Sequence, residues 1–308
     1  MAAFHPMEPM MHTDSDAALI ARINALTEPL EPQPTAASPS IEPLAGIRAV
    51  LFDIYGTLVI SGCGDIGLTA PTTAHAAFLG AWSAAGLDTT RLPASFDGPS
   101  ALTAEIRAEH AASRDRGVGC PEVNIIAVWQ ALLATCGVAA AAEQVRRLAL
   151  EYELRTNPVW PMPGLRATLR TLAERGLVLG VVSNAQFYTP LILHAFLGQP
   201  MQAAGFDLRC CAFSYREGVA KPSTEVYVPA LHGLWQHRGI DPASVLYVGN
   251  DMRNDVQPAR ALGCRTALFA GDARSLRLRT EDAELRDIAP DRVVTELNQI
   301  TSALLPGA

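Results

Sequence analysis

One apolar run constrains the fold of this chain more than any other stretch. Residues 49–52 read Ala-Val-Leu-Phe without polar alternation, which predicts a strand buried on both faces of a parallel sheet. Asp53 ends the run, and Gly56 allows a sharp turn three residues later. A carboxylate at the end of a buried strand is costly to desolvate, so it normally has a metal, a donor network or a substrate as its partner. For this fragment alone, a capped strand end is the competing interpretation.

The composition excludes several classes of protein. With 49% hydrophobic and 18% charged residues over 308 positions, the chain can bury a core and is long enough for one large domain or a core with an insertion. A net charge of −7 without any Lys/Arg cluster argues against nucleic acid and anionic membranes as partners. No apolar run approaches a membrane span, no signal peptide is evident, and the six cysteines lack paired spacing. We therefore expect a cytoplasmic location.

The pattern divides the chain into an arm, a core and an insertion. Residues 1–45 combine a short helix at 16–26 with a proline-rich stretch, which predicts an N-terminal arm or linker that is either disordered or draped over the fold or a second subunit. Helical periodicity without strand runs fills residues 63–160. It predicts a helical insertion with helices at 74–86, 100–116, 121–136 and 139–156.

From residue 163 onward, helices and strands alternate. The predicted strands are 177–182, 210–213, 245–248, 265–269 and 292–294, separated by helices at 164–175, 189–197, 224–239 and 255–262. This alternation predicts a parallel sheet with right-handed crossovers. The expected fold is α/β: a Rossmann-like parallel sheet core with helices on both faces, plus an α-helical cap domain. Residues 46–62 and 161–308 form the core in this prediction, and residues 63–160 form the cap.

Polar residues follow the ends of several predicted strands. Asp53, Ser183, Lys221 and the pair Asn250 and Asp251 each lie at the carboxyl end of a strand or on the loop after it. In an open α/β sheet these ends face one crevice, where ligands bind. Each residue alone is compatible with an ordinary turn or helix start. Together at one sheet edge, they predict a functional site.

This set of motifs resembles the haloacid dehalogenase-like hydrolase superfamily. The order and spacing of the motifs agree with that family, and the helical insertion lies where the family often carries a cap. The resemblance covers about residues 47–305 and leaves the N-terminal arm unexplained. The matching segments are Asp53-Ile54-Tyr55-Gly56-Thr57, Ser183-Asn184, Lys221-Pro222, and Gly249-Asn250-Asp251 with Asp255.

The resemblance implies an aspartate nucleophile. Asp53 would form a covalent ester or acyl phosphate that water then hydrolyses, and Lys221 would neutralise substrate or transition-state oxygens as a point charge. The Ser183 hydroxyl and the Asn184 amide would add hydrogen-bond donors. The family's catalytic positions in this sequence are thus Asp53, Tyr55, Thr57, Ser183, Asn184 and Lys221.

The resemblance also implies a Mg²⁺ site. Asp251 and Asp255, with Asp53, would gather carboxylate oxygens suited to a hard cation that bridges the nucleophile and a phosphoryl oxygen. Tyr55 and Asn250 belong to the same implied metal set. Asn250 stands where many family phosphatases have an acid.

Tyr55 leaves two hydrolytic activities open. Family phosphatases usually have a second aspartate at this position as general acid, whereas 2-haloacid dehalogenases have a tyrosine there and use no metal. The acids Asp251 and Asp255 favour the phosphatase, because without a cation they would repel Asp53. We therefore expect a Mg²⁺-dependent phosphatase acting on a small phosphorylated metabolite. The alternatives are a metal-independent 2-haloacid dehalogenase and a catalytically weak relative that only binds a phosphorylated ligand.

Substrate specificity is expected to depend on the cap, because a lid that closes on the crevice excludes water and contacts the leaving group. The expected partner is a small, anionic molecule. The sequence leaves open whether the protein forms a homodimer. Ser61 and Asp65 are stronger candidates than the cap residues, because the loop at 60–67 joins the nucleophile strand to the cap. The cap candidates, each more readily explained as a solvated or packed helix residue, are Arg107, His110, Arg114, Glu122 and Asn124.

Overall fold

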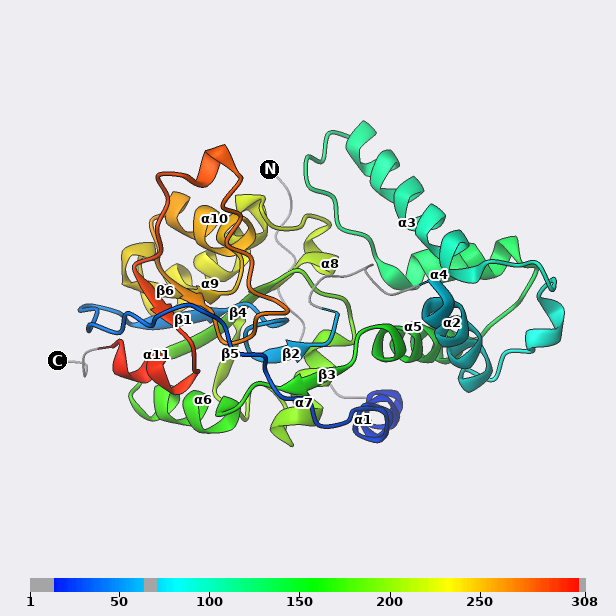
Figure 1. Ribbon diagram of the computed structural model, residues 1–308, viewed down its shortest axis with the longest axis horizontal. Coiled ribbons are helices and arrows are strands. Elements are labelled where there is room, and N and C mark those ends of the chain that lie inside the picture. The colour runs from blue at the N-terminus through cyan, green and yellow to red at the C-terminus, as the bar shows by residue number, and fades with distance from the viewer. Residues whose placement is uncertain (1–13, 64–70, 305–308) are drawn as a thin grey trace.

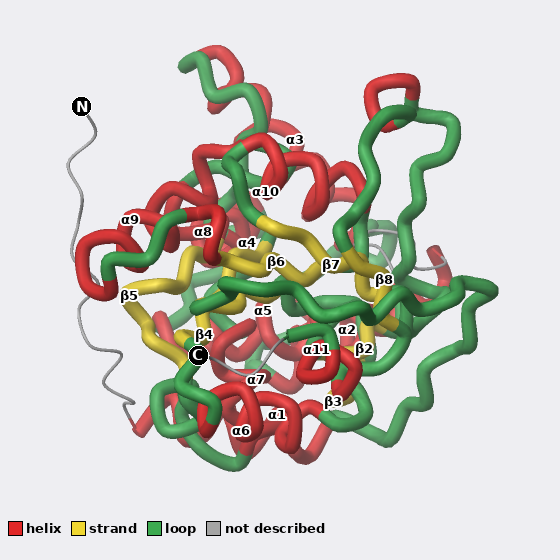
Figure 2. The backbone as a smooth tube through the Cα atoms, turned by 90° about the vertical axis from the view of Figure 1, so that its left-hand side faces the viewer, coloured by secondary structure: helices red, strands yellow, loops and turns green. Residues whose placement is uncertain are grey.

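A six-stranded parallel sheet forms the centre of the protein. The computed structural model describes residues 14–63 and 71–304. The strand order is β5-β4-β1-β6-β7-β8, and every neighbouring pair runs parallel. Figure 2 shows the strands of this sheet in yellow. This confirms the predicted Rossmann-like α/β core. The strands are β1 (Ala49–Phe52), β4 (Val178–Ser183), β5 (Phe206–Phe213), β6 (Val245–Gly249), β7 (Arg265–Phe269) and β8 (Arg292–Val294).

The register of the three central strands aligns their carboxyl ends. Phe52, the last residue of β1, pairs with Val181 of β4 on one side and with Val248 of β6 on the other. All four residues of β1 are buried, as expected for a strand covered on both faces. Asp53 therefore leaves the sheet at the same level as the ends of β4 and β6, which sets up a shared polar edge.

Helices cover both faces of the sheet, and successive residues of β1 contact opposite layers. Val50 and Phe52 belong to the core layer under α6 and α7, whereas Ala49 and Leu51 face α9 and α10 (Figure 2). No helix in residues 14–63 and 71–304 is both long and apolar enough to cross a bilayer. The helices of the core are α6 (Leu165–Glu174), α7 (Thr189–Leu197), α8 (Ser214–Glu217), α9 (Val228–Arg238), α10 (Gln257–Ala261) and α11 (Asn298–Ser302).

Four further helices lie to one side of the sheet and form the helical cap (Figure 1). A two-stranded antiparallel ribbon, β2 (Val59–Ser61) and β3 (Val159–Pro161), connects them to the core. The sequence pattern did not reveal this ribbon, because each strand has three residues and the two are almost a hundred residues apart. The ring centroids of Phe78 and Trp129 lie 5.7 Å apart in the centre of the cap. The cap helices are α2 (Pro71–Ala84), α3 (Gly98–Asp115), α4 (Ile125–Thr135) and α5 (Ala142–Thr156).

Several predicted bounds shift for identifiable reasons. Strand β5 starts four residues before the predicted 210–213, because this edge strand carries an ion pair, Asp207 and Arg209, that interrupts its apolar pattern. The predicted helix at 255–262 is replaced by a π-helical turn and the short α10. The remaining turns are η1 (Thr89–Arg91), η2 (Thr224–Tyr227), η3 (Pro242–Ser244), η4 (Met252–Val256) and η5 (Ala283–Leu285).

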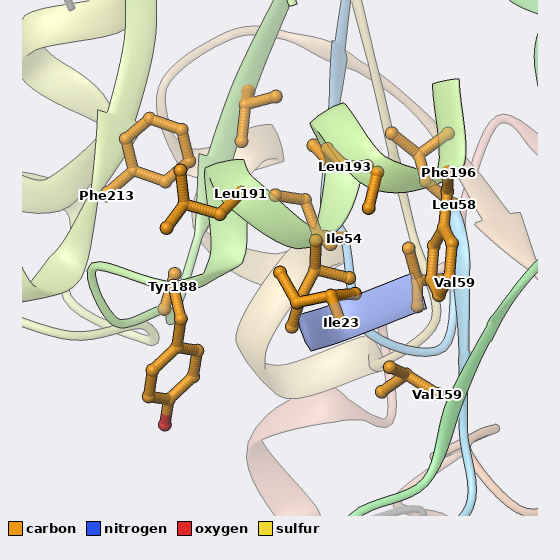
Figure 3. Close-up of a cluster of buried hydrophobic side chains, with 14 of the residues drawn as sticks. Ile23, Ile54, Leu58, Val59, Val159, Tyr188, Leu191, Leu193, Phe196 and Phe213 are labelled. Atoms are coloured by element: carbon orange, nitrogen blue, oxygen red, sulfur yellow. The ribbon is translucent and has the colours of Figure 1, made fainter. Parts of the chain in front are cut away.

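The described part of the N-terminal arm packs along the fold. Its helix α1 (Asp14–Leu26) contacts α7 of the core and α5 of the cap. Ile23 of α1 is fully buried and lies among Ile54 and Leu58 of the loop that follows β1 (Figure 3). Further along, the Thr35 hydroxyl donates to the Ala270 carbonyl at 2.7 Å. The arm therefore contributes to the same apolar core that supports the loop after Asp53.

A buried ion cluster joins α1 to the cap. The side chain of Glu151 in α5 is fully buried and accepts hydrogen bonds from Arg22 of α1 and from Arg155. Arg147 Nε lies 3.6 Å from the same carboxylate. A carboxylate without solvent needs such partners, because the desolvation penalty of an unpaired buried charge is several kcal/mol.

Replacing Arg22 by methionine is expected to lower the free energy of unfolding by about 1–3 kcal/mol, because a buried carboxylate loses one charged donor while two arginines remain. Chemical denaturation followed by circular dichroism measures this change. Arg170→Met is the matched control: its pair with Glu174 is 3.9 Å long and exposed, so its loss is expected to cost less than ~1 kcal/mol. Equal effects of the two substitutions would contradict a structural role for the Glu151 cluster.

Candidate active site

A lysine bridges two aspartates at the carboxyl edge of the sheet. Lys221 Nζ lies 2.6 Å from Asp53 Oδ1 and 2.6 Å from Asp255 Oδ1. The three side chains are 3%, 9% and 2% exposed, respectively, so they meet in a nearly water-free environment. The Tyr247 hydroxyl lies 3.3 Å from the same ammonium and donates to the Val182 carbonyl at 2.8 Å. One positive and two negative charges leave this cluster with a net charge of −1 when all three groups are ionised.

The cluster shifts the pKa values of Lys221 and Asp255. Burial alone would lower the pKa of Lys221, but the two adjacent carboxylates outweigh it and raise that pKa well above its usual range. Burial raises the pKa of Asp255 to about 6, although Lys221 acts in the opposite direction. Lys221 is thus a permanent cation at this edge, and it is also the only lysine in the whole sequence.

Asn184 holds the backbone of Lys221 in place. Its side-chain oxygen accepts from the Lys221 amide at 2.7 Å, and its amide nitrogen donates to the Lys221 carbonyl at 3.3 Å. The sequence predicts Asn184 as a donor to substrate, whereas the structure shows both ends of its amide bound to Lys221. Ser183 is fully buried at the end of β4, with its hydroxyl 3.4 Å from the Asn184 carbonyl.

The loop after Asp53 is locked to the segment after β6. Gly56 has φ +82°, and a Cβ there would come within 2.7 Å of the Asn250 amide nitrogen and 2.5 Å of Ser275 Cβ. Only glycine therefore fits this position without displacing its neighbours. The buried Thr57 hydroxyl donates to Asn250 Oδ1 at 3.1 Å, and Asn250 Nδ2 donates to the Ser275 carbonyl at 2.6 Å. Thr57 thus orients Asn250 instead of contacting Asp53.

The Asp251 carboxylate is occupied by contacts with neighbouring protein groups. Its carboxylate accepts from the backbone amides of Arg253 and Asn254 at the start of the π-helical turn. It also pairs with Arg279, whose Nη2 lies 2.7 Å from Asp251 Oδ2. These contacts satisfy both oxygens of Asp251.

The carboxylate oxygens that remain do not form the predicted metal site of three carboxylates. Asp255 Oδ1 is bound to Lys221, and Asp255 Oδ2 accepts from the Asp251 amide at 2.9 Å. Asp53 Oδ2 is the one carboxylate oxygen of the set that accepts no hydrogen bond from the described residues. Within residues 14–63 and 71–304, no group of three or more His, Cys, Asp or Glu side chains is arranged to hold a metal ion. Because Asp251 and Asp255 are bound to other groups, the residues as arranged do not fit the Mg²⁺ site implied by the resemblance.

Tyr55 turns its hydroxyl away from the lysine cluster. The phenol oxygen lies 3.1 Å from the Thr189 hydroxyl at the start of α7. Burial raises the pKa of Tyr55 well above its usual value, and the charges of Glu153 and Asp53 raise it further. The phenol therefore stays protonated and is a weaker acid than an exposed tyrosine.

A cavity of about 1030 Å³ lies between the cap and the carboxyl edge of the core. Tyr55 and Asn184 line it from the core side, and all four cap helices contribute to its wall. Asp53, Lys221 and Asp255 are not among its lining residues, and Asn184, which binds Lys221, connects their cluster to it. Its apolar lining includes Leu102, Val123 and Trp129. Its volume and mixed lining are typical of a small-molecule site.

The cavity separates the predicted cap candidates into two groups. Arg107, His110 and Glu122 line it, whereas Arg114 and Asn124 are not among its lining residues. Asn124 instead caps α4 by accepting from the Ile126 amide at 3.0 Å. Glu122 joins the cap to the core, because it accepts from the Ser214 hydroxyl at 2.7 Å and from Gln186 at 3.2 Å. Ser61 donates to Asn157 at 2.8 Å, and Asp65 lies outside the described residues.

Sequence reasoning missed Tyr247, Arg279 and Glu153. Tyr247 had a usable signal, since a hydroxyl on a wholly buried strand needs a hydrogen-bond partner. Arg279 and Glu153 had none, because their contacts with Asp251 and with the cavity depend on the tertiary fold.

The parallel sheet, the helical cap and the Asp53–Lys221–Asp255 cluster define a capped Rossmann-like hydrolase. The chain belongs to the haloacid dehalogenase-like hydrolases, since the model of that family matches residues 47–263. Over 102 residues it is 34% identical to phosphoglycolate phosphatase of Haemophilus influenzae, and over 111 residues it is 32% identical to N-acetylmuramic acid 6-phosphate phosphatase of Pseudomonas aeruginosa. These matches span 33% and 35% of this chain, and 41% and 43% of the relatives.

Solved structures agree with this fold. A haloacid dehalogenase-family phosphatase from Thermococcus onnurineus superposes with a TM-score of 0.50 at 17% identity, covering 85% of this chain and 99% of that one. A 2-haloacid dehalogenase from Pseudomonas syringae superposes with a TM-score of 0.52 at 20% identity, covering 83% and 97%. At these identities the likeness concerns the fold and does not distinguish the two activities.

Proposed function

We propose that this protein is a phosphatase that hydrolyses a small phosphate monoester through an aspartyl-phosphate intermediate on Asp53. The observation that carries the proposal is the Asp53–Lys221–Asp255 cluster beside a cavity of about 1030 Å³. The two relatives named as phosphatases favour phosphate esters as the substrate class.

In this proposal Asp53 is the nucleophile and Lys221 the cation that stabilises the transferred group. An oxygen of Asp53 attacks phosphorus, the bond from phosphorus to the leaving oxygen breaks, and an acyl phosphate forms. Lys221 stabilises the charge on the transferred oxygens, while Asn184 and Tyr247 keep the ammonium in position. Water then attacks the acyl phosphate, releases phosphate and regenerates the carboxylate.

The net charge of the cluster determines whether this reaction needs an additional cation. The cluster carries −1 before substrate binds, and a phosphate monoester dianion brings two further negative charges. One ammonium cannot balance them in a buried site, so the phosphatase reaction requires a further cation. We propose that added Mg²⁺ supplies it, which requires Asp251 or Asp255 to exchange its present partner for the metal.

The second candidate is a metal-independent 2-haloacid dehalogenase. Two observations favour it: the described residues contain no three-carboxylate cluster, and Tyr55 stands where phosphatases of the family have an acid. A haloacid brings a single negative charge, which Lys221 can balance alone.

Chelation separates the two candidates. We expect the purified protein to hydrolyse 4-nitrophenyl phosphate, to lose this activity in excess EDTA, and to regain it with Mg²⁺. We expect no chloride release from 2-chloropropionate under either condition. Chloride release that is insensitive to EDTA, without phosphate ester hydrolysis, would replace the phosphatase proposal by the dehalogenase.

A further inference from the structure

A phosphatase with a tyrosine at position 55 needs its leaving-group proton from elsewhere. An alkoxide leaving group is a strong base, and general acid catalysis of its departure is typically worth ~10²–10⁴-fold in rate. The buried phenol of Tyr55 is hydrogen-bonded to Thr189, and its raised pKa makes it a poor proton donor. Any substitute must face the same cavity as Tyr55.

Glu153 of the cap helix α5 meets this requirement. It lines the cavity together with Tyr55, and its charge acts on the Tyr55 phenol, as that of Asp53 does. Tyr188, on the core loop that follows Asn184, donates its hydroxyl to Glu153 Oε2 at 3.0 Å. The Glu153 carboxyl group is thus attached to the core edge while its backbone belongs to the cap.

The support of Glu153 continues into the linker ribbon. Asn157 donates to Glu153 Oε1 at 3.0 Å and accepts from the Ser61 hydroxyl of β2 at 2.8 Å. Ser61, a candidate from the sequence, therefore positions Asn157, which in turn positions Glu153. Such a chain of hydrogen bonds fixes the carboxyl group at one place in the cavity wall.

The surroundings of Glu153 favour its protonated form. Burial raises the pKa of Glu153, and the two hydrogen bonds from Asn157 and Tyr188 only partly oppose this. Glu153 lies in the last turn of α5, where the partial negative charge of the helix end also disfavours a carboxylate. Tyr55 and Glu122 are close enough to act on the Tyr188 phenol that binds Glu153. The other titratable groups of the cavity wall are His75, Asp97, Arg107, His110 and Tyr152, and no cation forms an ion pair with Glu153 in the described part of the chain.

We propose that Glu153 is the general acid that protonates the leaving group, in place of the acid missing at position 55. This proposal rests on the phosphatase activity proposed above. As the phosphorus–oxygen bond breaks, the Glu153 proton moves to the leaving oxygen, which departs as a neutral alcohol. The resulting carboxylate then removes a proton from the water that attacks the acyl phosphate, and the acid form is restored.

The test is the dependence of rate on leaving-group pKa in Glu153→Gln. Wild type is expected to hydrolyse alkyl and aryl monoesters with a shallow dependence. Glu153→Gln keeps the size of the side chain and one acceptor oxygen for Asn157, while the Tyr188 hydroxyl can turn to accept from the new amide group. It is expected to lose ~10²-fold or more in kcat on glycerol 3-phosphate but only a few-fold on 4-nitrophenyl phosphate, whose leaving group needs no proton. The alkaline limb of the kcat–pH profile on the alkyl ester should also disappear.

Two controls keep the outcome specific. Glu122→Gln changes the other buried carboxyl group of the cavity, which is bound to Ser214 and Gln186, and is expected to leave the leaving-group dependence unchanged. Tyr55→Asp in the Glu153→Gln background is expected to restore much of the alkyl activity. Equal losses on alkyl and aryl esters in Glu153→Gln would overturn the proposal. A protein inactive on all phosphate esters would instead refute the phosphatase itself.

Discussion

Asp53→Asn is expected to reduce turnover by roughly 10⁴-fold or more, the scale of effect seen when a covalent nucleophile is removed. The amide nitrogen and oxygen cannot attack phosphorus, and no other carboxylate of the cluster is open in the described structure, because Asp255 is bound at both oxygens. The measurement is single-turnover hydrolysis of 4-nitrophenyl phosphate, with acid-quenched protein analysed for a phosphate adduct that only wild type should show.

The fold is expected to survive this substitution. Asparagine has nearly the same size, and Lys221 keeps its ion pair with Asp255. Asp272→Asn is a suitable control, since Asp272 is also a buried aspartate but contacts Arg274 and the N-terminal arm. It should retain wild-type turnover. An Asp53→Asn protein with wild-type rates would remove Asp53 from the nucleophile role.

Lys221→Met is expected to have the second-largest effect, on both catalysis and stability. Without the ammonium, Asp53 and Asp255 face each other in a buried site, and breaking such an ion pair typically costs ~3–5 kcal/mol. Turnover should fall by ~10² or more, because the transition-state oxygens lose their cation. Lys221→Arg restores the charge but not the compact geometry, and is expected to recover stability more than activity.

The stability of Lys221→Met is expected to depend on pH with a defined sign. The pKa of Asp255 is already raised to about 6, and losing the cation raises it further. The folded variant then binds more protons than the unfolded chain between the unfolded and folded pKa values, so its stability falls as pH rises through that window. Thermal unfolding at pH 5 and pH 8 should show a larger deficit against wild type at pH 8. A deficit independent of pH would contradict repulsion between the two carboxylates.

The sequence was sufficient to predict the parts of the fold that depend on local pattern. The buried run at 49–52 and the alternation after residue 163 predicted the central sheet, and with it the placement of Asp53 and Ser183 at the same edge. The β2–β3 ribbon could not be predicted, because pairing between two three-residue segments depends on the helices that bring them together.

The site likewise combines features that the sequence predicts with features that depend on the tertiary fold. The spacing of the motifs correctly brought Asp53, Lys221 and Asp255 to one edge. It could not show that Asp251 pairs with Arg279, because the motif reads the same whether the aspartate is free to bind a ligand or is already paired within the protein. The cap contributes Glu153, which in the sequence looks like any other polar residue of a helix. Only its closeness to Tyr188 and Tyr55 in the fold distinguishes it.

The single lysine of this protein has a practical consequence for handling it in the laboratory. Reagents that couple to amines, from sensor-chip esters to fluorescent dyes, find only the chain's amino terminus and the Nζ of Lys221, because every other basic side chain apart from histidine is an arginine. Of these two amines only the terminus is open to reaction, because Lys221 is buried, ion-paired and held in its protonated, non-nucleophilic form. The same fact makes isotopic labelling simple: a protein grown with ¹⁵N-lysine would give one ammonium signal in an NMR spectrum, and that signal would follow each event at the nucleophile directly.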